Sequence, residues 1–448
     1  TGDKETDSPT SYVIAPAKKD TKPDRASIPQ FSRRESLAEA VTESNPLLAK
    51  AFVNHVWALL VGRGLVHPVD EINSKHAPSH PELLNWLAKH FESTNYDIKE
   101  LIESIANEKI KELNAGAKSV AIGPNDGGLA TFCMCPECRK LDPPEGRPIT
   151  LMDATGKQGR TYFKHVSLTD RFVSFWNEIA KRVVTVHPDA WLTADAYSVY
   201  TDPPLQHKLH PNIAIRFVDI WYLDDAEHKV GRARWDAWAE KASKLYFRSN
   251  LLLAARRYGT PVIYVHKLAK DFQYLAHHSM IGTDLDCCTH HWATQGLNYY
   301  VAARLHWNPD LNVDAVINDY CQSGFGAGAD SVKRYFMRLE EITDEIAAAG
   351  PALHPTTPYT PEVIEELRSI LDGAARKAVA PKTRDRVAFL HRGLDYTEVH
   401  ASAYHLLAEF DDSGRKMTPE LKMRVQANLN RNWALSREIL FTDFKAAH

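Results

Sequence analysis

An alternation of short apolar runs with amphipathic helical stretches, between about residues 118 and 286, limits the fold most strongly. The five apolar runs are SVAIGPND, AWLTADAY, NIAIRFVDIW, KLYFRSNLLL and SMIGTDLD, and the stretches between them include DRFVSFWNEIAKRVV, ARWDAWAEKASK and VHKLAKDFQYLAHH. Repeated βα units predict an α/β fold with a parallel sheet. Because a closed β/α barrel has eight strands, the sequence predicts a partial, incomplete TIM-like barrel of about five parallel strands. We place it at residues 114–350.

The part of the chain before this barrel has a different pattern. Residues 1–30 are rich in charged and small polar residues and predict a disordered lead-in, because they hold too few apolar side chains to offset the entropy of ordering. Residues 31–113 predict an all-α segment with three helices. Asn45 should cap the first helix, a capping box from Ser79 to Glu82 the second, and Asp97 the third.

Residues after the last apolar run are predicted to be helical. Three helical stretches between 292 and 350 lead to the Pro-rich break PALHPTTPYTP, and three further amphipathic stretches follow. These last stretches predict a small antiparallel helical bundle, so we assign residues 351–448 to a C-terminal helical domain.

The composition bears on partners and on location. A formal net charge of -3 supplies no large basic field, so we expect no nucleic-acid partner. No run of 18 apolar residues occurs, and we expect no membrane partner. The chain begins at Thr1 without a charged and apolar leader, so we expect any signal peptide to be removed or to lie outside it. A secreted or periplasmic location is our expectation, and the oligomeric state stays open.

Two resemblances to known families rest on longer motifs. Residues 118–345 resemble domain-of-unknown-function family 4838 through GPNDGG, CMCPEC, LYFRSN, HHWATQGLNYYVAARLHWNP and DYCQSGFG. Residues 33–105 resemble domain-of-unknown-function family 1553 through NPLLAKAFVNHVWALLVGRGLVHPVDEI and SHPELLNWLAKHF, with His55 where that family usually has Arg. The first family is grouped with TIM-barrel glycoside hydrolases and normally has an earlier half-barrel. The resemblance therefore implies carbohydrate chemistry by analogy of fold, and a fusion, a deletion or a misassembled gene near residues 106–117.

Hydrolysis of a glycosidic bond needs two carboxyl groups that face each other. Asp126 follows the first apolar run and is our candidate general acid, and Asp286 ends the last run and is our candidate nucleophile or base. Related family members tend to have an acidic residue at the second position, often the longer Glu. The alternative is that Asn125 and Asp126 only cap the following turn.

Further candidates lie near the predicted strand ends, where they would contact a bound sugar. The predicted substrate-binding residues are Asn125, Asp195, Tyr197, Asp219, Trp221, Arg248, Asn250, Asp284, His291 and Trp292. Arg248 and Asn250 alternate onto one side of their strand, and an Arg there suits hydroxyl or carboxylate groups. A salt bridge within the barrel is the alternative role for them.

Three cysteines, Cys133, Cys135 and Cys138, lie close enough to hold one soft metal if a fourth ligand joined them. The paired CxxC motifs of a zinc site are absent, and a disulfide or buried thiols explain the cluster as well. We predict no metal site and no cofactor. The leading hypothesis is a glycoside-hydrolase-like protein with a carbohydrate ligand. The alternatives are a non-catalytic carbohydrate-binding or surface protein, and a non-functional gene fusion.

Overall fold

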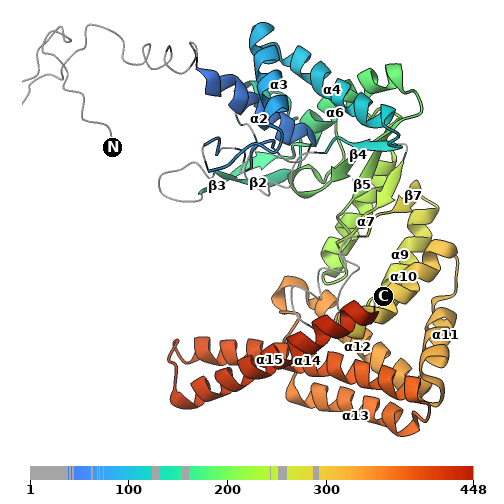
Figure 1. The fold of residues 1–448 in the computed structure, drawn as a ribbon. Helices are drawn as coiled ribbons and strands as arrows, with labels where there is room; N and C mark the ends of the chain where they lie inside the picture. Colours follow the sequence, from blue (N-terminus) through green and yellow to red (C-terminus); the bar gives the residue numbers. More distant parts are fainter. Residues whose placement is uncertain are drawn as a thin grey trace, which may run out of the picture. The chain divides into compact units, whose positions relative to one another are not determined.

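The structure is a computed structural model, and it describes residues 39, 42, 45–61, 64–67, 69, 71–73, 75–123, 132, 134, 136–153, 161–242, 244–250, 260–285 and 292–446. The described chain is mixed α/β (Figure 1), and it forms two compact units. The first unit holds the described residues up to 123 together with 182–190, and the second holds 132–181 and the residues from 191 onward. The predicted lead-in of residues 1–30 lies outside the described residues.

The first unit consists mainly of helices. They are α2 (Pro46–Val61), α3 (Pro81–Ser93) and α4 (Ile98–Asn114), and the short strand β1 (Ser119–Ala121) follows. The three predicted helices are therefore confirmed. Asn45 Oδ1 accepts a hydrogen bond from the Leu47 amide at 3.0 Å, and Asp97 Oδ1 accepts one from the Lys99 amide at 2.8 Å, so both predicted caps form.

The predicted capping box is wrong. The N-cap of α3 is His80, one residue later than predicted, and it makes no side-chain cap. Ser79 does not cap α3, because its hydroxyl and its amide both donate to the carbonyl of Leu65, at 3.1 and 2.7 Å. A tertiary contact with a loop 14 residues earlier thus replaces the local motif.

Asn54 of α2 fixes that loop from inside the unit. Its side chain is fully buried, and its Nδ2 donates to the carbonyls of Val66 and Val69, both at 3.1 Å. The amide of Val66 donates in return to Asn54 Oδ1 at 2.9 Å. A buried amide that replaces backbone partners in this way stabilises one conformation of the loop. Nothing in the sequence pattern distinguished Asn54 from a surface polar residue of the helix.

The sheet of the second unit is parallel. Its strands are β4 (Trp191–Ala196), β5 (Ile213–Phe217), β6 (Leu245–Phe247) and β7 (Met280–Thr283), in the order β4-β5-β6-β7. Each of the five predicted runs contains a strand, because β1 forms in the first of them. The strands are shorter than predicted: β1 ends at Ala121 and β7 ends at Thr283.

Helices accompany these strands as the βα pattern predicted. They are α6 (Thr169–Val186), α7 (Asp225–Ala239) and α9 (Val265–Ala276). The α7 helix begins earlier than predicted because Asp224 caps it, accepting hydrogen bonds from the amides of Ala226 and Glu227. Between β4 and β5 the described chain forms only the short 3-10 turn η2 (Ser198–Tyr200).

The two faces of this sheet differ in polarity. One cross-strand row joins Ala196, Phe217, Phe247 and Thr283, and its first three residues are buried. The adjacent row joins Asp195, Arg216, Tyr246 and Gly282, and all four are half-buried. Since neighbouring residues of a strand point to opposite faces, one face is apolar and the other carries charges and a tyrosine.

A β-hairpin precedes α6 and was not predicted. Strands β2 (Pro148–Asp153) and β3 (Thr161–Val166) pair antiparallel, with Pro148 opposite Val166 and Asp153 opposite Thr161. Buried Asp142 anchors the chain next to it, through Arg171 of α6 and through His165 of β3, whose Nε2 lies 2.7 Å from Asp142 Oδ2. The apolar runs predicted for the parallel sheet do not include residues 148–166.

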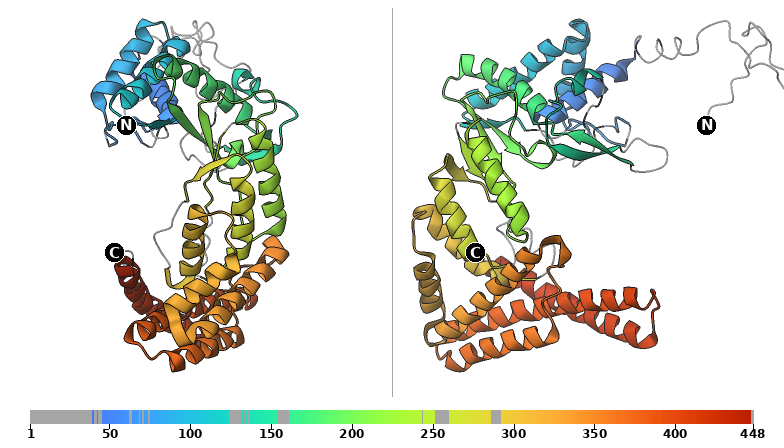
Figure 2. Two further views of the ribbon diagram at one scale, coloured as in Figure 1. Left: turned by 90° about the vertical axis from the view of Figure 1, so that its right-hand side faces the viewer. Right: turned by 180° about the vertical axis from the view of Figure 1, so that it is seen from behind.

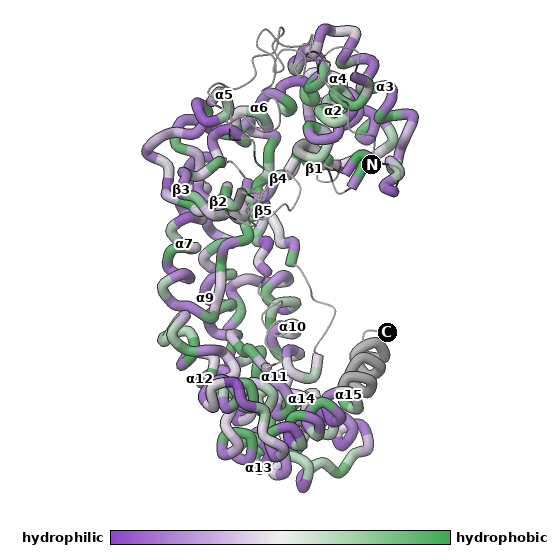
Figure 3. The backbone as a smooth tube through the Cα atoms, turned by 90° about the vertical axis from the view of Figure 1, so that its left-hand side faces the viewer, coloured by the Kyte–Doolittle hydropathy of each residue, from purple (hydrophilic) through white to green (hydrophobic). Residues whose placement is uncertain are grey.

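The rest of the second unit is helical. It contains α10 (Trp292–Trp307), α11 (Val313–Phe325), α12 (Ala329–Ala349), α13 (Pro361–Lys377), α14 (Pro381–Asp412) and α15 (Pro419–Ala446). Helices α13, α14 and α15 lie side by side (Figure 2), and hydrophilic and hydrophobic residues alternate along them where Figure 3 is coloured. No described helix combines the length and the apolar character needed to cross a membrane.

Candidate functional site

Charged side chains from three strands meet at the carboxyl-terminal edge of the parallel sheet. Arg216 of β5 contacts Asp195 of β4, and its Nη2 donates a hydrogen bond to Asp195 Oδ2 at 3.0 Å. Arg216 Nε lies 2.8 Å from Asp195 Oδ1 and forms an ion pair with it, without hydrogen-bond geometry. The same guanidinium reaches the exposed Asp284 after β7, where Nη1 and Oδ2 are 3.3 Å apart. We call these three residues, with Arg248 and Asn250, the edge cluster.

The backbone places the other members of the edge cluster. After β6 and β7 the ladder continues by one residue, because the Arg248 amide donates to Phe217 O at 3.0 Å and the Asp284 amide donates to Phe247 O at 3.1 Å. Arg248 Nη1 then donates to Asn250 Oδ1 at 2.9 Å. The predicted neighbours Arg248 and Asn250 are therefore brought together, next to Asp195 and Asp284.

Burial controls the acidity of Asp195. Loss of solvent raises the pKa of this carboxyl above its ordinary value, while the positive charges of Arg216 and Arg248 and the hydrogen bond from Arg216 act in the opposite direction. Both oxygens of Asp195 face one guanidinium, so the carboxyl is occupied as a partner of Arg216. Such a group suits the positioning of Arg216 better than proton transfer to a ligand.

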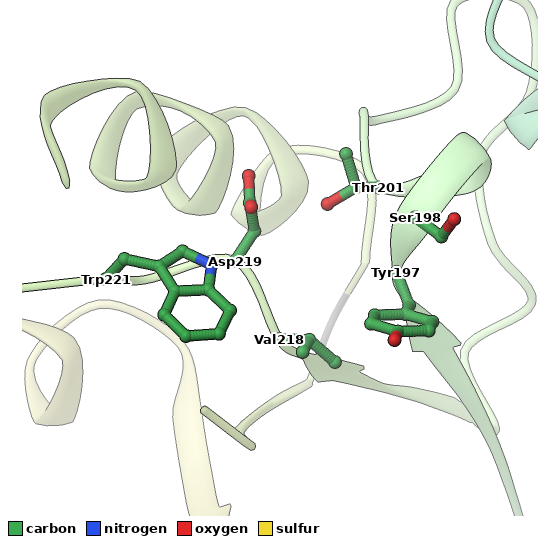
Figure 4. A pocket seen from close by; sticks show the side chains of 6 residues that line it. All are labelled: Tyr197, Ser198, Thr201, Val218, Asp219 and Trp221. Carbon is green, nitrogen blue, oxygen red and sulfur yellow. The ribbon is translucent and has the colours of Figure 1, made fainter. Parts of the chain in front are cut away.

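A pocket of about 230 Å³ lies beside this edge, at the ends of β4 and β5 (Figure 4). Its lining comes from Tyr197, Ser198, Thr201, Val218, Asp219 and Trp221. In Figure 4 the rings of Tyr197 and Trp221 stand on opposite sides of the space, with Val218 between them. We call this space the aromatic pocket. Its lining residues supply two aromatic rings, three hydroxyl groups and one carboxylate.

Asp219 is fixed by an ion-pair chain behind the aromatic pocket. Arg234 of α7 pairs with Asp219 and also donates through Nε to Asp202 Oδ1 at 2.9 Å, and Arg147 reaches Asp202 at 2.8 Å. Burial raises the pKa of Asp219, and Arg234 partly offsets this by its charge and its hydrogen bond. The helix can approach because position 231 is Gly: a Cβ there would lie 2.0 Å from Asp219 O.

A family model described as "Domain of unknown function (DUF4838)" matches residues 72–338, more than half of the 448-residue chain. The chain belongs to the DUF4838 family. A second family model, "Protein of unknown function (DUF1553)", matches residues 33–110 and overlaps the first. The two predicted resemblances are confirmed in identity and order, although the DUF4838 match begins well before residue 118. No curated protein matches the chain.

Several predicted site residues of this DUF4838 chain lie outside the described residues. They are Asn125, Asp126, Asp286 and His291, and the cysteines Cys133 and Cys135 lie outside as well. Cys138 lies in the four-residue helix α5 (Pro136–Arg139). Within the described part of the chain, no group of three or more His, Cys, Asp or Glu side chains is placed to hold a metal ion.

The other predicted residues of the DUF4838 region fall into three places. Asp195, Arg248, Asn250 and Asp284 form the edge cluster, and Tyr197, Asp219 and Trp221 line the aromatic pocket. Trp292 of α10 lines a different pocket. Sequence reasoning missed Arg216, the centre of the edge cluster. Its signal was a charged residue in the middle of the apolar run NIAIRFVDIW, a pattern typical of a strand whose one face is polar.

Proposed function

We propose that this chain is a carbohydrate-binding protein of the glycoside-hydrolase-like kind, and that it holds a sugar at the carboxyl-terminal edge of β4–β7. The observation that carries the proposal is the convergence of polar and aromatic side chains from successive parallel strands at that one edge. In β/α folds ligands bind at this edge, because the loops after the strands surround it.

The chemistry of the two neighbouring groups fits a sugar. A sugar ring presents hydroxyl groups around its rim, which carboxylate and guanidinium groups of the edge cluster can bind in pairs. Its flatter C–H faces pack on aromatic rings such as Trp221 and Tyr197. At about 230 Å³ the aromatic pocket lies below the roughly 300–1,000 Å³ of sites for drug-sized ligands, so we assign it one sugar unit.

The incomplete barrel is part of the proposal. Parallel strands alternate with helices between β5 and β7, and polar side chains follow the strand ends. A closed TIM barrel needs eight strands, and the described part of the second unit supplies four parallel strands. On this account the chain retains the ligand-facing edge of a barrel and binds carbohydrate there, with little or no turnover.

Paired tryptophan substitutions test carbohydrate binding. Affinity electrophoresis and calorimetry against a panel of soluble polysaccharides would first identify a ligand for the wild-type chain. Trp221→Ala should then weaken that binding by at least about tenfold, because an aromatic stacking surface is lost. The control is Trp307→Ala, since Trp307 is 91% exposed at the end of α10 and does not line the aromatic pocket. Equal affinities for the two variants would contradict the proposed site.

Hydrolysis by Asp126 and Asp286 is a second candidate function. Both residues follow strands of the predicted series closely, since β1 ends at Ala121 and β7 ends at Thr283. If the chain hydrolyses a glycan, Asp126→Asn and Asp286→Asn should each abolish turnover and leave binding and melting temperature nearly unchanged, because Asn keeps the size of Asp but cannot cycle a proton. Turnover that survives both substitutions would eliminate this pair.

A further inference from the structure

A second pocket lies between the end of β7 and helices α9 and α10, and its volume is about 320 Å³. Apolar and aromatic side chains supply most of its wall: Leu268 of α9, Leu285 after β7, and Trp292, Tyr299 and Ala302 of α10, with Tyr264 before α9. Trp292 and Tyr299 meet edge to face, with ring centroids 4.6 Å apart. We call this space the β7 pocket.

The β7 pocket is separate from the edge cluster. Thr283 lines it and belongs to the cross-strand row of the apolar face, where Phe247 contacts Phe272 of α9. The next residue, Asp284, pairs with Arg216. Consecutive residues of an extended chain point to opposite sides. The β7 pocket therefore opens on the helix side of the sheet and shares no lining residue with the aromatic pocket.

A donor in its wall, on Trp292, makes no hydrogen bond within the described residues. The indole Nε1 of Trp292 is buried and makes no hydrogen bond there. Two other polar side chains of the wall are occupied: Asn298 bonds the Tyr264 amide and Val262 O, at 3.2 and 2.7 Å, and His306 bonds Ala302 O and Thr283. Since an indole N–H can only donate, the complementary group on a ligand is an acceptor oxygen.

We propose that the β7 pocket binds a small, flat aromatic molecule that carries an acceptor oxygen, which the Nε1–H of Trp292 contacts. The volume lies within the roughly 300–1,000 Å³ of small-ligand sites. Aromatic walls favour an aromatic occupant through edge and face contacts. A buried donor without an acceptor is unfavourable, so a ligand that supplies one gains affinity and selectivity.

Two matched probes test this proposal: acetophenone, which has an acceptor oxygen, and ethylbenzene, which has none. Ligand-observed NMR titration should show saturable binding of both to the wild-type chain, with acetophenone the tighter. Trp292→Phe should weaken acetophenone by about fivefold to tenfold, the effect of one lost hydrogen bond, and change ethylbenzene by less than about twofold.

The exposed rim residue Ala303 provides a second variant that leaves the core intact. Ala303→Phe should occlude the pocket and abolish binding of both probes while the melting temperature stays at the wild-type value. Trp221→Ala should not affect either probe, so this result is independent of carbohydrate binding. Absence of saturable binding, unchanged binding in a folded Ala303→Phe variant, or an equal effect of Trp292→Phe on both probes would overturn the proposal.

Discussion

Replacing Arg216 by Met should destabilise the second unit in a pH-dependent way. Asp195 and Arg216 keep only 21% and 28% of their side-chain surface exposed, so the substitution leaves a largely buried carboxylate without its partner. Breaking a fully buried pair costs about 3–5 kcal/mol, and the remaining exposure reduces this, so we expect a loss of about 2–3 kcal/mol near neutral pH. Urea unfolding followed by tryptophan fluorescence measures it.

The sign of the pH dependence follows from proton binding. Burial already raises the pKa of Asp195, and loss of the Arg216 charge raises it further. Between the unfolded and the folded pKa the native state binds the extra proton, so this group's contribution to stability falls as the pH rises. The difference between wild type and Arg216→Met should therefore be largest near pH 7.5 and smaller near pH 4.5, because protonation of Asp195 as the pH falls removes the unpaired buried charge.

Two further variants control this experiment. Asp195→Asn combined with Arg216→Met removes both charges and should recover most of the loss at neutral pH. Arg424→Met breaks an exposed pair with Glu409 and should cost less than about 1 kcal/mol at any pH. A loss for Arg216→Met that is equal at both pH values, and that the double variant does not recover, would refute the electrostatic reasoning.

Three other predictions address contacts elsewhere in the fold. Asn54→Ala should lower the free energy of unfolding of the first unit by about 3 kcal/mol in urea titrations, since it leaves buried backbone groups of the loop without partners. A change below about 0.5 kcal/mol would contradict this. Gly231→Ala should lower the free energy of unfolding by about 3 kcal/mol, because its Cβ would overlap Asp219 O. Gly324→Ala is the control and should cause no loss, because nothing lies within 4 Å of a Cβ at that position. Equal melting temperatures for the two variants would refute the close approach. The pKa of His266 is raised, chiefly by its hydrogen bond to Glu340 and also by Asp314. The stabilising contribution of His266 is therefore present below about pH 6.5 and is lost as the pH rises through the raised pKa. Glu340→Gln should lower that pKa in an NMR titration, and an unchanged value would rule out the contact.

The strands could be predicted from the sequence because each is a short apolar run that ends in polar residues. One face of each run carries apolar side chains, and Leu192, Ile215 and Phe247 are buried there in the expected core. The same reasoning placed Asp195, Tyr197 and Asp219 near the sheet edge that the structure shows. Strand position along the chain therefore predicted that these three residues lie near strand ends.

Pairing between distant residues could not be predicted in the same way. The contact of Arg216 with Asp195 and Asp284 depends on strand register, and the contact of Arg234 with Asp219 depends on how closely α7 approaches. Neither is a local property of the sequence. No strand was predicted for the hairpin β2–β3, whose antiparallel pairing lies outside the βα pattern, and Ser79 failed as a cap because Leu65 offered a competing acceptor.

Hydrogen–deuterium exchange in the presence of a bound oligosaccharide tests the central claim most directly. The ligand would be the one that the polysaccharide panel identifies, used at saturation, and peptides would be compared with the free protein. We predict protection confined to the carboxyl-terminal ends of β4–β7 and the residues that follow them, which are 195–201, 216–221, 248–250 and 284–285. Protection in helices α13–α15 without any change at the sheet edge, or failure of every glycan in the panel to bind, would contradict the account.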